Sequence, residues 1–325
     1  MANDLPPRAR AFVDKAGWSG SDVRALPADA SSRRYFRLVR GEERAMLMDA
    51  PPPDENPGAF LDAAHYLLDK GFRAPAILAE AREDGLILLE DFGDTPMRSH
   101  VEAAPGNEEA TYAAAVDTLA RLHAAPGGPF DPYDLNAYLR EVKLLPEWFC
   151  RSHGVRVDDD GYEEAWREVL APLLDRQGGG VTVLRDYHAE NIMVLDDGDL
   201  GLIDFQDALL GHRAYDLVSL LQDARRDVSP ALETAMLDRY RRATGADDDF
   251  DADYARLGAQ RNAKIVGIFV RLAERDGKDR YLKLIPRVWN LLERDLAHPA
   301  LAPVARWFDA NIDGDLRTRV SDIGA

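Results

Sequence analysis

The stretch Leu184-Arg185-Asp186-Tyr187-His188-Ala189-Glu190-Asn191 decides the fold, because it sets an aspartate and an asparagine in one polar loop between two apolar runs. A third apolar run, residues 200–203, is followed directly by Asp204. Phosphoryl transfer needs a carboxylate that orients the attacking hydroxyl and accepts its proton, and hard oxygen ligands that hold Mg²⁺ against the phosphates. Asp186 fits the first role, and Asn191 and Asp204 fit the second.

The apolar runs around this loop predict short strands within a helical half of the chain. The predicted strands are residues 181–184, 192–195 and 200–203, and residues 196–199 (Asp-Asp-Gly-Asp) form a hairpin turn between the last two. Apolar positions at helical spacing predict helices at residues 108–123, 215–225, 231–244, 254–274 and 284–297.

The N-terminal part has the pattern of a small sheet. Residues 35–40 and 45–48 predict two strands around a turn at Gly41-Glu42. A helix over residues 60–70 ends at Gly71, and residues 85–89 predict a buried strand that leads into a polar connector.

These motifs resemble those of a known group of enzymes. Arg-Asp-x-x-x-x-Asn followed by Ile203-Asp204-Phe205 resembles the catalytic and metal-binding motifs of protein-kinase-like phosphotransferases, most strongly the aminoglycoside phosphotransferase branch. More narrowly, residues 185–191, 203–208 and 214–225, together with Asp-Ala-Ser-Ser-Arg-Arg-Tyr-Phe-Arg at 29–37, are similar to the bacterial anomeric N-acetylmuramate/N-acetylglucosamine kinases. The similarity spans roughly residues 20–300.

The resemblance implies an α+β, protein-kinase-like fold of two lobes. Residues 1–90 would be a nucleotide-binding lobe with an antiparallel sheet, residues 90–94 a hinge, and residues 95–325 a larger helical lobe with the catalytic loop and the substrate site. It further implies ATP and Mg²⁺ as cofactors, and transfer to the anomeric hydroxyl of an amino sugar, giving a sugar 1-phosphate in cell-wall recycling. A phosphotransferase for an aminoglycoside, choline or a similar cation is the alternative. A nucleotide-binding pseudokinase is the alternative from another class.

The nucleotide side shows the clearest departure from the wider family. The strand that carries a phosphate-binding lysine in kinases corresponds to residues 45–49, Ala-Met-Leu-Met-Asp, which contain no lysine. Ser31 and Ser32 occupy the place of the glycine-rich loop. Arg33 or Arg34 could supply the missing positive charge, because guanidinium groups bind phosphate well; alternatively, both are surface arginines.

Asp91-Phe92-Gly93 is a literal copy of the kinase metal-binding triplet. Its place in the chain, far ahead of Asp186 and directly after a buried strand, argues instead for the hinge. The hinge prediction assigns Leu89, Glu90 and Phe92 to the nucleotide, with backbone groups of the last two meeting the adenine.

The remaining assignments concern the acceptor and the support of the loop. A sugar site needs an aromatic platform and polar groups for hydroxyls, and an arginine would suit a carboxylate on the sugar. The predicted substrate-binding residues are Tyr138, Arg140, Glu147, Trp148, His188, Gln206, Asp207 and Arg213. Asp216 resembles the kinase aspartate that supports the catalytic loop through its backbone.

The amino-acid composition limits the classes of partner that the protein is expected to bind. The formal net charge is −18, and no Lys/Arg-rich block compensates for it, so we expect no binding to nucleic acid or anionic lipid. No apolar run approaches the roughly 18 residues that span a bilayer. The single cysteine and the lack of a basic-then-apolar N-terminus favour the cytoplasm. The expected partners are a small-molecule sugar and a nucleotide, and the sequence does not indicate an oligomeric state.

Overall fold

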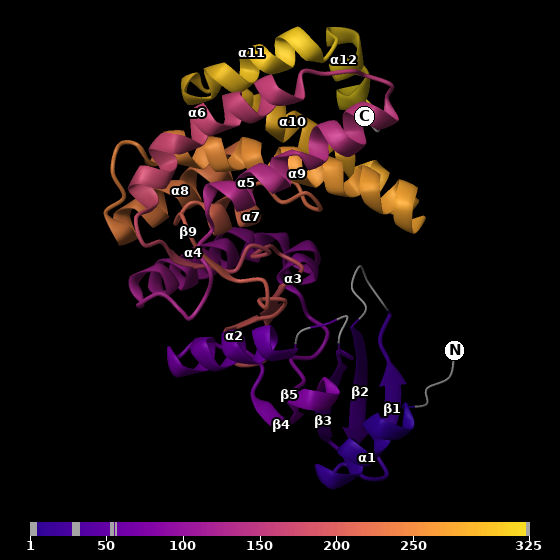
Figure 1. Cartoon of the computed structure of the whole chain (residues 1–325). Coiled ribbons are helices and arrows are strands. Elements are labelled where there is room, and N and C mark those ends of the chain that lie inside the picture. Colours follow the sequence, from indigo (N-terminus) through magenta and orange to yellow (C-terminus); the bar gives the residue numbers. More distant parts are fainter. Residues whose placement is uncertain (1–4, 28–32, 53–54, 56, 323–325) are drawn as a thin grey trace. The chain divides into compact units, whose positions relative to one another are not determined.

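The computed structural model describes residues 5–27, 33–52, 55 and 57–322 (Figure 1). The chain divides into two compact units, each built from two stretches of sequence. The first unit comprises Met1–Pro105 and Glu190–Ala208, and the second comprises Gly106–Ala189 and Leu209–Ala325. This division differs from the expected boundary at residues 90–94. The reason is that Met193 forms a β-bridge with Pro96, and Gly201 forms one with Arg73, so that residues 190–208 fold onto the first unit.

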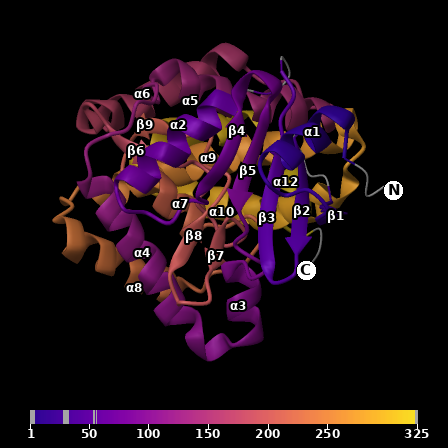
Figure 2. The same cartoon turned by 90° about the horizontal axis from the view of Figure 1, so that it is seen from below.

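The first unit is built on an antiparallel sheet with the strand order β1-β2-β3-β5-β4, seen in Figure 2. Its elements are α1 (Pro7–Lys15), β1 (Asp22–Ala25), β2 (Arg34–Arg40), β3 (Glu43–Asp49), α2 (Pro57–Asp69), β4 (Ile77–Ala81), β5 (Leu86–Glu90), α3 (Met97–Ala103), β7 (Ile192–Val194) and β8 (Leu200–Leu202). Gly41 links β2 to β3 at φ 62°, a left-handed conformation that glycine adopts without a Cβ penalty. The predicted hairpin at this turn is confirmed.

Strand register divides the side chains of this sheet between two faces. Phe36, Leu47 and Leu88 are paired across β2, β3 and β5, and they pack with α1 in one buried cluster. Tyr35, on the opposite face, is paired with Met48. Because side chains alternate along a strand, a slip of one residue would exchange the two faces. The apolar pattern therefore fixes which residues can reach the cavity described below.

The second unit is mainly helical, as predicted. Its elements are α4 (Glu108–Ala124), α5 (Leu135–Val142), the π-helical turn Leu145–Cys150, α6 (Asp159–Gln177), β6 (Val181–Val183), β9 (Leu209–Gly211), α7 (Tyr215–Leu221), α8 (Pro230–Thr244), α9 (Phe250–Asp276), α10 (Ile285–Leu296), α11 (Ala302–Asn311) and α12 (Gly314–Asp322). The long helix α9 packs against α5, α7 and α10. It ends where Gly277, at φ 66°, donates its N–H to the carbonyl of Ala273. No helix within the described residues is long and apolar enough to cross a membrane.

Candidate functional site

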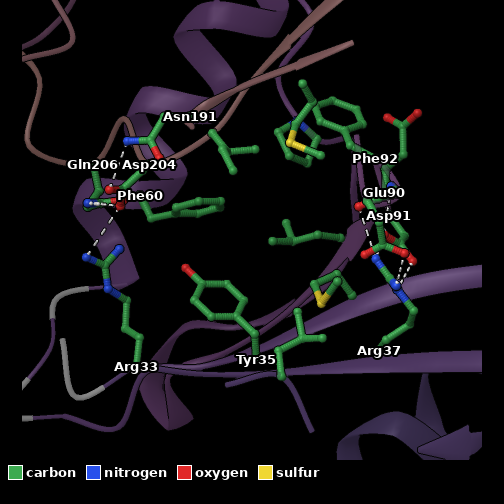
Figure 3. A pocket seen from close by; sticks show the side chains of 18 of the residues that line it. Arg33, Tyr35, Arg37, Phe60, Glu90, Asp91, Phe92, Asn191, Asp204 and Gln206 are labelled. Atoms are coloured by element: carbon green, nitrogen blue, oxygen red, sulfur yellow. Dashed lines mark hydrogen bonds and ion pairs between the residues drawn. The ribbon is translucent and has the colours of Figure 1, made fainter. Parts of the chain in front are cut away.

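A cavity of about 430 Å³ lies in the first unit (Figure 3). Tyr35 and Met46 line it from the sheet, and Phe60 lines it from α2. Phe60 stacks on Phe205 with 5.1 Å between the ring centroids, which holds the loop after β8 against α2. The cavity is thus largely apolar in its middle, a surface that suits a flat aromatic base.

The polar end of the cavity is formed by the residues around β7 and β8. Asn191 precedes β7, and Asp204 follows β8. The Asn191 amide Nδ2 donates to Asp204 Oδ2 at 3.3 Å, and Gln206 Nε2 donates to Asp204 Oδ1 at 3.0 Å and to Asp207 Oδ2 at 3.2 Å. Of the residues predicted for metal and substrate, Asn191, Asp204, Gln206 and Asp207 therefore share one end of this cavity.

Asp204 has an unusual backbone. Its φ is 60°, in the left-handed region that costs a non-glycine residue on the order of 1–3 kcal/mol, although aspartate tolerates it better than most. Such conformations persist where the surrounding structure fixes them, often at functional sites. Here the hairpin fixes the strand end: Ile203 donates its N–H to the carbonyl of Asn191 at 3.1 Å, which ties the two predicted ligands together.

The donor set of this end fits Mg²⁺. A carboxylate and an amide oxygen are hard ligands, and Mg²⁺ is commonly bound by one or two carboxylates together with phosphate oxygens and waters. Among the described residues, no group of three or more His, Cys, Asp and Glu side chains could form a metal cage. The residues therefore suit a metal that arrives with a phosphate.

The two arginines predicted to meet phosphate have different surroundings. Arg33 lines the cavity, where its Nη2 lies 3.9 Å from Asp204 Oδ1 and its Nε lies 3.3 Å from Glu55 Oε2. Arg34 does not line the cavity; its Nη2 lies 2.5 Å from Oδ2 of the fully buried Asp49, which also pairs with Arg8. The prediction of a phosphate-facing side chain is thus retained for Arg33, and Arg34 has a structural partner. Ser31 and Ser32 lie outside the described residues.

The opposite end of the cavity is formed by the end of β5 and the segment that follows it. Leu89, Glu90 and Phe92 line the cavity there, as the hinge prediction requires. The N–H of Glu90 donates to the Ala76 carbonyl at 2.9 Å, so this group is engaged within the sheet. Gly201 allows β8 to approach Phe92, because a Cβ at that glycine would lie 2.6 Å from the ring.

Arg37 holds this segment, and the sequence did not single it out. Its guanidinium pairs with Asp91 at 2.5 Å and Asp94 at 2.7 Å, and donates to the Gly93 carbonyl at 3.1 Å. Asp91 is therefore a buried structural partner of Arg37, which agrees with a hinge and not with a metal-binding triplet. The signal in the sequence was the alternation of Tyr35 and Arg37 along one face of β2, with Arg33 directly before that strand.

The second unit carries the predicted catalytic loop. Asp186 is partly exposed, and its Oδ1 accepts a hydrogen bond from Arg261 Nη2 at 3.3 Å. Burial alone would raise the pKa of Asp186, but Arg261, and after it Lys264, lower that pKa well below its usual range. The carboxylate is therefore ionised at neutral pH, as a proton acceptor must be.

Asp216 holds the backbone of this loop. The carboxylate is fully buried and accepts the N–H of Leu184 at 2.6 Å and the N–H of Arg185 at 2.8 Å. Burial raises the pKa of Asp216 to about 7, and the two N–H donors oppose that rise. Arg185, directly before Asp186, has φ 70°, so this hydrogen bond secures a backbone that is otherwise unfavourable.

A buried cluster of charged side chains contacts the loop of Asp186 through Arg185. Glu141 accepts hydrogen bonds from Lys264 Nζ at 2.8 Å and from Arg185 Nη2 at 2.5 Å. Burial raises the pKa of Glu141, but Lys264 and then Arg185 reverse this and lower it to about 2. Arg261 also lies over the Tyr215 ring at 5.5 Å. The sequence pattern of α9 predicted a helix but not this cluster, because buried charges on a helix resemble surface charges in a sequence.

The predicted substrate residues of the second unit have diverse environments. Tyr138 is fully buried, stacking on Tyr133 with 3.9 Å between ring centroids, so it belongs to the core and is not the predicted sugar platform. His188 is buried with its Nε2 3.3 Å from Arg225, and burial lowers its pKa to about 3, so it is neutral and supports the loop. Arg140, Glu147 and Arg213 are exposed, and Trp148 is half-buried.

The chain is similar to proteins of known family. The profile of the phosphotransferase enzyme family (APH) matches residues 22–259. The N-acetylmuramate/N-acetylglucosamine kinase of Caulobacter vibrioides is 38% identical over 98% of this chain and 99% of its own length. The protein of the same name from Pseudomonas aeruginosa is 36% identical over 90% of this chain and 89% of its own.

Solved structures agree on the fold. The ADP-bound aminoglycoside phosphotransferase APH(2'')-Ib aligns with a TM-score of 0.62 at 16% identity, over 89% of this chain and 97% of that chain. The predicted fold class and the predicted resemblance are confirmed. The chain belongs to the phosphotransferase enzyme family.

Proposed function

We propose that this phosphotransferase moves the γ-phosphoryl group of ATP to the anomeric hydroxyl of N-acetylmuramate, N-acetylglucosamine or a related hexosamine, giving a sugar 1-phosphate in cell-wall recycling. The observation that carries the proposal is the 38% identity to an N-acetylmuramate/N-acetylglucosamine kinase along 98% of the chain. The site supports it, because Asp186, Asn191 and Asp204 each have the environment that their proposed role needs.

Asp186 orients the sugar hydroxyl and accepts its proton as the oxygen attacks phosphorus. Arg261 keeps the carboxylate ionised and fixes its direction. Asn191 and Asp204 would hold Mg²⁺, which neutralises charge on the β- and γ-phosphates when bound. The apolar middle of the cavity takes the base, and the segment at residues 89–93 takes its edge.

The alternative acceptors are cations such as an aminoglycoside or choline, which the net negative charge of the chain would attract. The local charges of the second unit do not favour them. Asp186 is in contact with Arg261, and Glu141 is paired with Lys264 and Arg185, so each of these carboxylates is already matched by a cation. A neutral or carboxylate-bearing acceptor meets less repulsion there than a polycation does.

A panel assay tests the proposal. ADP release is measured with N-acetylmuramate, N-acetylglucosamine, other hexosamines, aminoglycosides and choline, for the natural protein and for Asp186→Asn. We expect turnover with the amino sugars only, and a loss of roughly 10²–10⁴-fold in kcat for Asp186→Asn. Asp160→Asn, an exposed change on α6, is the matched control and should retain full activity. Turnover confined to the cations would refute the sugar assignment, and nucleotide binding without any turnover would identify a pseudokinase.

A further inference from the structure

No lysine lines the cavity of the first unit among the residues that the structure describes. Among the described residues that line it, the cationic side chains are Arg33 and Arg37. Arg37 is committed to Asp91 and Asp94 at the hinge end. Arg33 lies at the other end, beside Asp204, as Figure 3 shows. It is therefore the cation that a nucleotide phosphate would meet next to the metal-binding carboxylate.

Arg33 is held in a way that leaves part of its guanidinium for a ligand. Its side chain is 12% exposed, and its Nε lies 3.3 Å from Oε2 of Glu55, whose side chain is 18% exposed. Its Nε and Nη1 are both buried and have no hydrogen-bond partner among the residues that the structure describes, so the contact with Glu55 is an ion pair without a hydrogen bond. A buried N–H without an acceptor is costly, and a phosphate oxygen would satisfy it.

The position of Glu55 explains how the pair is assembled. Arg33 directly precedes β2, and Glu55 lies just before α2, which begins at Pro57. Protein kinases use a lysine on a strand and a glutamate on a helix to hold the phosphates. Here the two charged residues lie outside regular elements, before β2 and before α2, and β3 contributes Met46 to the cavity.

We propose that Arg33, braced by Glu55, is the phosphate-binding cation of this enzyme and replaces the lysine–glutamate pair of other kinases. The guanidinium binds phosphate oxygens of the nucleotide through its Nη groups, while Glu55 holds the Nε side and fixes the plane of the group. An arginine suits this role because its charge is permanent and its donors match a phosphate in bidentate geometry. The inference rests on the proposed function only in taking a nucleoside triphosphate as the donor.

Calorimetric titration without any acceptor tests the pair. Adenosine, MgADP and MgATP are titrated into the natural protein and into Arg33→Gln, Arg33→Lys and Glu55→Gln. A hydrogen bond to a charged group contributes about 1.5–3 kcal/mol, so Arg33→Gln should weaken MgADP and MgATP by roughly 10–150-fold and leave adenosine unchanged. Arg33→Lys should recover part of the loss. Glu55→Gln should show a smaller loss, and the double variant should bind no worse than Arg33→Gln alone.

The control is Arg24→Gln, which removes an exposed arginine from β1 and should bind all three ligands like the natural protein. Equal affinity of Arg33→Gln and the natural protein for MgATP would overturn the proposal. An equal loss of adenosine and MgATP would overturn it too, because the effect would then not depend on phosphate. Since no acceptor is present, these outcomes are independent of the sugar assignment, which the panel assay decides.

Discussion

The substitution Asp216→Asn tests whether the proposed catalytic loop is held by two hydrogen bonds from its own backbone. In the natural protein, Asp216 Oδ2 accepts the N–H of Leu184 and Oδ1 accepts the N–H of Arg185. An asparagine keeps one acceptor and turns an NH₂ group toward the other N–H. One buried donor then loses its acceptor, at a cost of about 1–3 kcal/mol. This is well below the roughly 5–15 kcal/mol that stabilises a typical domain, so the variant should fold.

The substitution should also slow catalysis. Arg185 is held at φ 70°, and without its hydrogen bond this backbone can relax and displace Asp186. A displacement of about 1 Å at a reacting group costs roughly 10²-fold in rate. We therefore expect kcat to fall about 100-fold, while MgATP affinity, which our proposal assigns to residues of the first unit, stays within about twofold of the natural value.

The assay combines urea unfolding, calorimetric titration with MgATP, and kcat with N-acetylmuramate. Asp295→Asn is the control for a change at a buried aspartate outside the loop, because Asp295 is 5% exposed and lies within hydrogen-bond distance of Gln222 and Asn262. The control should leave kcat close to that of the natural protein. A folded Asp216→Asn variant with natural kcat would refute the account of the loop.

Three further predictions follow from the site and its charges. Asp204→Asn removes a charged group that we propose as a metal ligand, so the Mg²⁺ concentration for half-maximal activity should rise by at least about tenfold; an unchanged requirement would place the metal elsewhere. Arg261→Gln removes the cation that lowers the pKa of Asp186, so that pKa should rise and the acid limb of the kcat profile should move to higher pH, whereas an unmoved limb would assign it to another group. Burial raises the pKa of Asp295 to about 8, so the folded state favours its protonated form and the free energy of unfolding should fall as pH rises from about 4 to 8. Asp295→Asn cannot titrate, and urea unfolding at pH 5 and pH 8 should show a weaker fall; equal slopes would contradict the buried, protonated Asp295.

The sequence predicted the elements whose periodicity is long or whose turns are marked. The hairpin at Gly41 and the helix predicted at 108–123, observed as α4 (Glu108–Ala124), are examples. The strands β1, β4 and β9 were missed, because short or edge strands carry little alternation. The helix expected at 215–225 ends at Leu221. Local pattern also could not reveal that residues 190–208 fold with the sheet, because that depends on bridges to Arg73 and Pro96.

The residues of the candidate site could be predicted where they belong to a sequence motif whose residue types indicate a chemical role. Asn191 and Asp204 lie at one end of the cavity, and Asp216 holds the loop of Asp186. Residues that act through distant contacts were not predictable: Arg261 reaches Asp186 from 75 residues along the chain. Tyr138 was misassigned because the sequence shows only that a tyrosine is present. Whether its ring is buried in the core or exposed as a platform for a sugar depends on the packing around it.

Phosphorus NMR of the product tests the central claim most directly. The natural protein is incubated with ATP, Mg²⁺ and N-acetylmuramate or N-acetylglucosamine, and the new phosphate resonance is assigned by its coupling to the sugar protons. The account predicts a phosphate coupled to the anomeric proton, together with an equal amount of ADP. A phosphate on any other sugar hydroxyl, or ADP without a sugar phosphate, would contradict it.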